Sequence, residues 1–230
     1  PSLNALKDAA DRVKWLFDNA FLFYCFYEQG PDAPSLISVP KGQSVELSFH
    51  NDENSNNQFL KFEQKAVLAP VEAIDPNYKF EGYRVFQLKD NVLINNDSFF
   101  MNKTDQVREV YQCDLGNSVK DVFYYTPNLA PNGQPTSWNK LPYVKGAKNN
   151  GIPQSFTVST DAFTGKPLEN GRTYYYTVVA YAYNNHTEFN PVENYGQRKQ
   201  YLQGRRNVKV YAVTPQKSVG PPLEINVVRL

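Results

Sequence analysis

The chain has 230 residues, enough for one large domain or two small ones with a buried core. It carries 24 Lys and Arg against 23 Asp and Glu, so the formal net charge is +1. This balance argues against a dedicated nucleic-acid-binding protein, which would show a basic excess on one face. Aromatic residues make up 14% of the chain, which excludes a disordered protein. The mean hydropathy is −0.57, and no segment has the roughly 18 apolar residues that a membrane-spanning helix needs.

The start of the chain and its cysteines place few limits on its compartment. Residues Pro1–Leu3 show no signal-peptide pattern, so we expect a mature product or a piece cut from a longer polypeptide. Cys25 and Cys113 are the only cysteines, too few for a scaffold held together by disulfides. They either form one disulfide in an oxidising compartment or remain two buried thiols, and the sequence leaves both alternatives open.

Only the first twenty residues have a helical pattern. Apolar residues recur there at steps of three and four: Leu3, Leu6, Ala10, Val13 and Phe17. Ser2 can serve as the N-cap, and the pattern ends at the aromatic run Phe21–Tyr27. Residues 1–28 are therefore predicted to be a helix and an aromatic linker, with the helix packed on a β domain. A membrane-surface helix is the less favoured interpretation, because the polar face mixes both signs of charge.

The rest of the chain has the pattern of β strands. Its apolar and polar residues alternate with period two in short runs that are rich in β-branched and aromatic residues. The predicted strands are Val45–Phe49, Gly82–Leu88, Ser155–Ser159, Thr173–Tyr181 and Asn207–Val213. Stretches rich in Asn, Pro and Gly separate them. Several short strands joined by such turns predict an antiparallel sandwich.

These strands resemble those of a fibronectin type III domain. Residues 168–180, LENGRTYYYTVVA, are similar to the family's Leu-x-Pro-Gly-Thr-x-Tyr-x-Val-x-Val-x-Ala signature at the turn into strand F. Residues 31–49 and 82–86 resemble strands A, B and C, with Phe49 where the family usually has a core Trp. The resemblance implies that Tyr174 is a tyrosine-corner residue, whose hydroxyl bonds nearby backbone while its ring fills the core.

The resemblance implies a mainly β fold class, a fibronectin type III-like antiparallel β-sandwich with long insertions and an N-terminal α-helix. The sandwich covers residues 29–217, with insertions at about 51–78 and 90–153, and residues 218–230 form a C-terminal tail or linker. Two sandwiches would need a second set of strand signatures. The sequence contains only one set, so it predicts a single sandwich. The implied core residues are Phe49, Tyr83, Val85, Leu168, Tyr174, Tyr176 and Val178.

A narrower resemblance concerns the kind of protein that contains such a module. Residues 75–88, 174–185 and 204–211 are similar to modules in very large secreted surface proteins of Bacteroidetes, many of which use the type IX secretion system. This resemblance implies a location outside the outer membrane or in the extracellular space. It also implies partners among the neighbouring domains of the same polypeptide and other cell-envelope proteins.

No motif in the sequence indicates catalysis or a cofactor. His50 and His186 are the only histidines, and they lack the spacing of a zinc site. Residues 51–57 offer oxygen ligands, but a solvated turn is favoured over calcium because the EF-hand pattern is missing. There is no Gly-x-Ser-x-Gly elbow and no phosphate-binding glycine loop. We therefore expect no enzyme, no metal and no cofactor, although a pair of carboxylates for glycoside hydrolysis would leave no trace in sequence spacing.

Aromatic and basic residues in the second half of the chain predict a candidate binding surface. Exposed aromatic rings would stack on sugars or anchor a protein partner, or they would instead pack against the insertions. The basic side chains would attract an anionic polymer, or they would guard a strand edge against aggregation, which is the favoured interpretation. The candidates are Trp138, Tyr143, Tyr195, Tyr201, Arg198, Arg205 and Arg206.

These features predict a non-catalytic structural or adhesive module of an extracellular or cell-surface bacterial protein, acting through protein–protein contacts. The alternative is a carbohydrate-binding or accessory domain of a secreted hydrolase, with aromatic rings facing a surface glycan.

Overall fold

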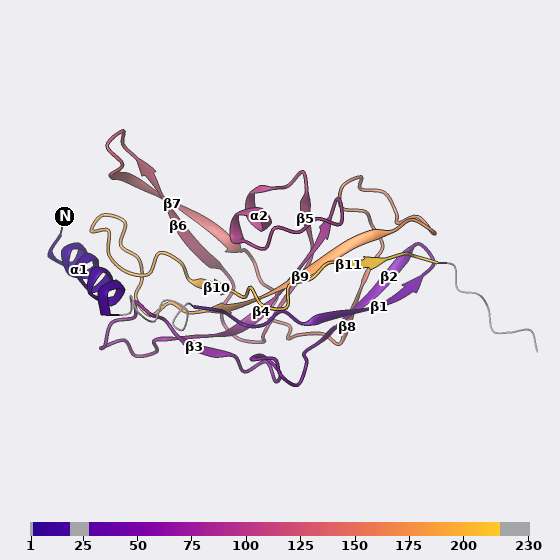
Figure 1. The fold of residues 1–230 in the computed structure, drawn as a ribbon, viewed down its shortest axis with the longest axis horizontal. Coiled ribbons are helices and arrows are strands. Elements are labelled where there is room, and N and C mark those ends of the chain that lie inside the picture. Colours follow the sequence, from indigo (N-terminus) through magenta and orange to yellow (C-terminus); the bar gives the residue numbers. More distant parts are fainter. Residues whose placement is uncertain (1, 19–27, 217–230) are drawn as a thin grey trace, which may run out of the picture.

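The computed structural model describes residues 2–18 and 28–216 (Figure 1). Within these ranges the protein is mainly β and every strand pairing is antiparallel, which confirms this part of the predicted fold class. The helices are α1 (Leu3–Asp18) and α2 (Asp97–Asn102). The strands are β1 (Ser35–Lys41), β2 (Ser44–His50), β3 (Glu63–Lys65), β4 (Asn77–Leu88), β5 (Val107–Asp114), β6 (Val122–Leu129), β7 (Pro135–Val144), β8 (Ser155–Val158), β9 (Tyr174–Tyr183), β10 (Tyr201–Gln203) and β11 (Tyr211–Val213).

A small sheet has the strand order β1-β2-β8. Its central strand β2 alternates as the sequence predicts, because Val45 and Leu47 are fully buried while Ser44, Glu46 and Ser48 are partly exposed. Val45 pairs with Val158, and Leu47 pairs with Phe156. One face of this sheet is therefore apolar and contributes to the core.

A larger sheet is built around β4 and β9, which pair along most of their length. β10 and β11 pair with opposite ends of β9, while β3 and β5 pair with β4. Almost all residues of β4 and β9 are buried, including those on both faces of the sheet. Strands with one solvated face would alternate between buried and exposed residues, so both faces of this sheet must be covered.

The main core lies between the two sheets. Buried side chains of the small sheet pack there against buried side chains of β4, β9 and β11 and against residues of the connecting loops. The largest fully buried side chains in this core include Tyr83, Tyr176, Phe80, Leu47 and Leu168.

The outer face of the larger sheet is covered by residues 90–153, the second predicted insertion. Phe99 and Phe100 of α2 pack on Phe86 and Val179. The hairpin β6–β7 packs its base on β9 and β10, and its outer part projects from the body (Figure 1). The same insertion also supplies β5, so it belongs partly to the sheet and partly to the layer over it.

The last predicted strand is interrupted in the structure. Residues 207–213 were expected to form one strand, but only Tyr211–Val213 are extended against β9. A Cβ atom at Gly204 would overlap the carbonyl oxygen of Pro31, so this position needs glycine. The chain then passes the entry segment, where the backbone N–H of Ala33 donates to the carbonyl oxygen of Arg206. This crossing separates β10 from β11.

The helix α1 begins as predicted, but its first turns present the opposite face to the body. Ser2 is its cap, because its Oγ accepts a hydrogen bond from the Ala5 N–H at 3.2 Å and donates one to the Glu193 carbonyl at 3.1 Å. The expectation that its apolar face packs on the β domain is wrong for its first turns, because Leu3 and Leu6 are 82% and 56% exposed. No helix among the described residues is long and apolar enough to cross a membrane.

Other predictions fall on residues outside this description. The aromatic run Phe21–Tyr27, Cys25 and the tail 218–230 lie outside the described residues. Cys113 is buried in β5 without a disulfide to any described residue, and burial raises the pKa of its thiol to about 12. This thiol is therefore protonated and unreactive at neutral pH.

Candidate functional site

Tyr174 makes the hydrogen bond expected of a tyrosine corner. Its ring is buried, and its phenol oxygen accepts a hydrogen bond of 2.9 Å from the backbone N–H of Glu169. The structure buries the other predicted core residues as well: Tyr83, Val85, Leu168, Tyr176 and Val178. Phe49 is half-buried and packs its ring against Tyr83 and Phe156, with centroid distances of 4.7 and 5.4 Å. These residues form the interior and present nothing to a ligand.

Two predicted surface aromatics are buried, so their assignment to a binding surface is wrong. The rings of Tyr143 and Tyr201 stack with their centroids 3.6 Å apart, where the base of the β6–β7 hairpin lies on β10. The Tyr143 hydroxyl donates to Gln203 Oε1 at 2.9 Å, and the Tyr201 hydroxyl donates to Asp97 Oδ2 at 3.1 Å. Tyr181 is fully buried in the same cluster.

Trp138 and Arg198 join the hairpin to the loop that follows β9. The indole of Trp138 meets the Phe189 ring edge-on at 5.0 Å, and the Arg198 guanidinium lies 4.7 Å from the indole centroid. On the neighbouring strand, Tyr125 packs on Phe189 at 4.7 Å. The Tyr125 N–H also donates to the Arg198 carbonyl at 2.8 Å. Beyond its base, the hairpin is thus also held along its length by rings, a cation and a backbone hydrogen bond.

The other basic candidates have separate roles. Arg206 Nε lies 3.3 Å from Oδ1 of the buried Asp32, so Arg206 neutralises a carboxylate near the start of the β domain. Arg205 is exposed next to it. Lys199 pairs with Asp97 at 2.6 Å. Among the accessible candidates, the structure therefore brings together only Trp138, Arg198 and Tyr195, the last of which lines a pocket with Arg198.

The Asn-rich stretch 51–57 caps the core. The amide groups of Asn51 and Asn57 donate to the Tyr83 hydroxyl at 2.8 and 3.3 Å. His50 is exposed, with Nε2 3.8 Å from Asp52 Oδ1. In the part of the chain that the structure describes, no group of three His, Cys, Asp or Glu side chains could hold a metal ion.

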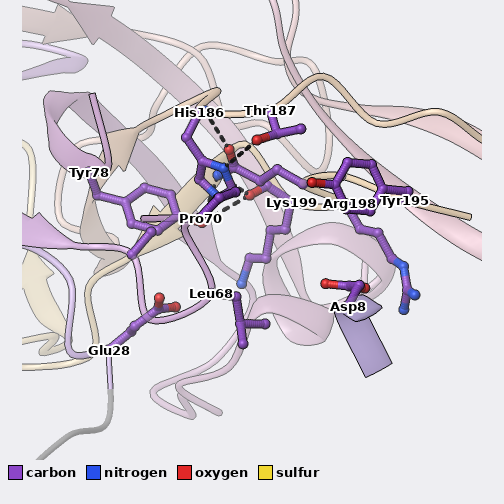
Figure 2. A pocket seen from close by; sticks show the side chains of 13 residues that line it. Asp8, Glu28, Leu68, Pro70, Tyr78, His186, Thr187, Tyr195, Arg198 and Lys199 are labelled. Atoms are coloured by element: carbon purple, nitrogen blue, oxygen red, sulfur yellow. Dashed lines mark hydrogen bonds between the residues drawn. The ribbon is translucent and has the colours of Figure 1, made fainter. Parts of the chain in front are cut away.

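The pocket that Tyr195 and Arg198 line has a volume of about 200 Å³. Its walls come from α1, from the β3–β4 loop (residues 66–76) and from the β9–β10 loop (residues 184–200). Figure 2 shows Asp8, Leu68 and Glu28 along its lower edge in that view, below Tyr78 and His186. Residues far apart in the sequence therefore meet at this end of the molecule.

Hydrogen bonds from one loop to the other give the pocket a defined shape. The His186 N–H donates to Asn184 Oδ1 at 2.7 Å and to Gln197 Oε1 at 2.9 Å. The Asn184 amide donates to the carbonyl oxygens of Asp75 and Asn77 at 2.9 and 2.7 Å. The β9–β10 loop is therefore fixed to the β3–β4 loop by buried amide groups.

Two titratable groups in the pocket, Tyr78 and His186, are uncharged at physiological pH. Burial is the main cause that raises the pKa of Tyr78, and its phenol donates to the Lys199 carbonyl at 3.0 Å. Burial lowers the pKa of His186, so the imidazole is uncharged, and its Nδ1 lies 3.0 Å from the Thr187 hydroxyl. These groups hold the loops in place and offer hydrogen bonds to a contacting molecule.

A wider groove of about 900 Å³ continues from the pocket and shares Pro70, His186, Thr187 and Tyr195 with it. Glu81 lies at its inner wall, at a β-bulge between β4 and β9. The Glu81 carboxylate is 4% exposed and accepts two hydrogen bonds from Asn117 Nδ2, at 2.9 and 3.0 Å. Burial, with a smaller contribution from the charge of Asp114, raises the pKa of Glu81 to about 7.

Exposed apolar side chains gather around the pocket and the groove. Val71 and Ile74 are fully exposed, and Val192 is 92% exposed. The Ser2–Glu193 hydrogen bond brings the start of α1 next to the loop that carries Val192. We call this surface the apolar end; its members are Leu3, Leu6, Leu68, Val71, Ile74 and Val192. α1 lies at the left end of Figure 1, opposite the end where the chain leaves β11.

The sequence reasoning missed the apolar end. Val71 and Ile74 follow neither a helical nor a strand period, and they lie between Pro70 and Pro76. The one signal in the sequence that could have indicated this surface was the presence of apolar residues in a loop bounded by prolines.

No family model, curated protein or solved structure matches this chain.

Proposed function

We propose that the protein is a non-catalytic structural or adhesive module that acts through protein–protein contacts at the apolar end. The exposure of Val71, Ile74 and Val192 around a pocket and a groove carries this proposal. Burying one such side chain against a partner is worth roughly 1.5–3 kcal/mol. Single exposed apolar residues are ordinary, but a group of them on adjoining segments marks an interaction surface.

The strand order and one hydrogen bond support a fibronectin type III-like sandwich as the scaffold. The grouping of β1, β2 and β8 in one sheet, as strands A, B and E, and of β4, β9 and β10–β11 in the other, as C, F and G, supports this assignment, with β3 and β5 as additional strands of the larger sheet. The hydrogen bond from the Glu169 N–H to the Tyr174 hydroxyl supports the same assignment.

The location and the partners belong to the same proposal. The module lies on an extracellular or cell-surface bacterial protein, outside the outer membrane, and its partners are neighbouring domains or other envelope proteins. Sequence resemblance to Bacteroidetes surface proteins is the support for this part.

The burial of two candidate rings leaves glycan binding with little support. Tyr143 and Tyr201 lie inside, and the indole of Trp138 already contacts Arg198 and Phe189. A sugar ring needs an accessible aromatic face. Protein contact is therefore the function that we propose.

Lysine-specific cross-linking and mass spectrometry on the full-length protein that contains this chain, in intact cells, test the proposal. Lys7 lies on α1, and Lys65 and Lys79 lie on β3 and β4 on either side of the β3–β4 loop of the apolar end. We expect these lysines to cross-link to other domains or proteins more often than Lys41 at the β1–β2 turn.

The double variant Val71→Asp/Ile74→Asp should remove these cross-links without lowering the thermal unfolding midpoint, because both side chains are exposed. The matched control is Val39→Asp, at a half-exposed valine of β1. Equal cross-linking from the apolar end and from Lys41, or cross-links that persist in the double variant, would refute the proposal.

A further inference from the structure

We infer that the partner at the apolar end is a second copy of this chain, with α1 of each copy lying in the groove of the other. This inference rests on the proposed function, because it identifies the occupant of the same surface.

The outward face of α1 is the first half of the contact. Successive residues of a helix are 100° apart, so Leu3, Leu6 and Ala10 share one face. All three are exposed, whereas Ala5 and Asp8 on the other side are partly buried. An amphipathic helix gains most of its stability by burying its apolar face. α1 therefore presents an apolar stripe that its own domain does not cover.

The groove is the second half of the contact. It is wide and open, and its lining contains both apolar and polar side chains. Its apolar members include Pro70, Ala73, Ile74, Leu115, Val119 and Tyr183. An open groove lined by apolar side chains is a surface on which a helix can place residues at spacings of three and four.

The charges beside the stripe and the groove are complementary. Lys7 lies next to the stripe, one turn from Leu3. The groove wall carries Glu72 and Asp75, and its one lysine, Lys79, already pairs with Asp75 at 2.6 Å. Among the described residues, neither Lys7 nor Glu72 forms a salt bridge. A helix that enters the groove brings these two opposite charges together.

The helix reaches a neighbouring molecule more readily than its own groove. Ser2 bonds to the Glu193 carbonyl and Asp8 lines the pocket, so the inner side of α1 is held against its own domain. To enter its own groove, the stripe would have to give up these contacts. Helix and groove adjoin on one surface, so a two-fold axis generates two identical contacts at once. Such self-complementarity is what a symmetric dimer requires.

Sedimentation velocity of the chain over a range of concentrations measures the oligomeric state. We expect a concentration-dependent dimer. Leu6→Asp should raise the dimer dissociation constant about tenfold or more while the thermal unfolding midpoint of the monomer stays unchanged. Val39→Asp, at an exposed valine away from the apolar end, should leave the dimer intact.

Disulfide trapping tests the geometry. In a Cys25→Ser background, a chain with Leu6→Cys is mixed with a chain with Ile74→Cys, and we expect a cross-linked heterodimer on oxidation. The buried thiol of Cys113 does not compete. The control mixture of Leu6→Cys with Val39→Cys should give no heterodimer above background. Lys7→Glu should weaken the dimer, and adding Glu72→Lys should restore it.

A chain that stays monomeric at all concentrations, or equal trapping in the control mixture, would overturn this inference. If the full-length protein still cross-links to other proteins through the apolar end, the proposed function survives that result. If these cross-links are missing as well, both proposals fail.

Discussion

The backbone N–H of Glu169 donates a hydrogen bond of 2.9 Å to the phenol oxygen of Tyr174, five residues along the chain. The bond ties the turn before β9 to the first residue of that strand. Leu168, beside it, is fully buried in the core between the two sheets. This small closed unit fixes where the central strand of the larger sheet begins.

Tyr174→Phe should destabilise the protein by about 1 kcal/mol, because the ring still fills the core while the Glu169 N–H loses its acceptor. Urea unfolding at neutral pH measures the difference. Tyr175→Phe removes a hydroxyl from the next residue, which is only half-buried, and should change the free energy of unfolding by less than about 0.5 kcal/mol. Equal effects of the two variants would contradict the role of the hydrogen bond.

Stability should fall as the pH rises from about 5 to 8, because of Glu81. Its pKa is raised from 4.5 to about 7 in the folded protein, so the folded state binds the proton more tightly than the unfolded state. The stabilisation is complete below pH 4.5 and is lost as the pH passes 7. A shift of this size corresponds to a stabilisation on the order of 3 kcal/mol. Asp114 faces Glu81 and its pKa is also raised, so it adds a contribution of the same sign.

Glu81→Gln tests this assignment, since the amide carries no charge at any pH in this range. Urea unfolding at half-unit steps between pH 5 and 8 should show a flatter profile for the variant and a gain in stability at pH 8. Tyr181 and Tyr183, which adjoin Glu81 from β9, stay neutral throughout because burial raises the pKa of each. A variant profile parallel to that of the unmodified protein would assign the pH dependence to other groups.

The strands at the centre of each sheet were predictable from local patterns. Val45 and Leu47 alternate with polar residues in β2, and the aromatic and β-branched run of β9 has no other plausible conformation. The hydroxyl contact of Tyr174 was predicted from the resemblance of residues 168–180 to a fibronectin type III signature. In these segments, local preference and tertiary packing agree.

The candidate surface was less predictable, because exposure depends on what covers a strand. Tyr143 and Tyr201 are aromatic residues among polar neighbours, which is equally typical of a binding surface and of an interface between two layers. Only the position of the β6–β7 hairpin over β10 decides between them. The break between β10 and β11 depends likewise on Gly204 meeting Pro31, a contact over more than 170 residues that no local pattern encodes.

Removing the partner of a buried guanidinium should cost more than removing the guanidinium itself. Arg84 donates through Nε to Glu109 Oε2 at 2.6 Å, and its guanidinium lies 4.9 and 4.6 Å from the ring centroids of Phe86 and Tyr143. Glu109→Ala leaves this buried cation unpaired and should destabilise the protein by about 3 kcal/mol. Arg84→Met keeps the aliphatic packing between the rings and should cost less. Thermal unfolding measures the loss of stability in both variants. A larger loss of stability in Arg84→Met than in Glu109→Ala would contradict this account.

Gly196→Ala should disrupt the β9–β10 loop and the pocket that it lines. Gly196 has φ of +101°, and a Cβ atom there would overlap the Glu188 carbonyl oxygen. The loop must move to relieve this overlap, so we expect the free energy of unfolding to fall by about 2 kcal/mol or more.

Gly133→Ala is the matched control, because its φ is +79° but a Cβ atom there meets open space. It should cost only about 1 kcal/mol from backbone strain. Hydrogen exchange of the His186 N–H, which the loop protects through Gln197, should accelerate in Gly196→Ala and not in Gly133→Ala. Unchanged exchange in Gly196→Ala would mean that the loop is held by contacts other than this close approach.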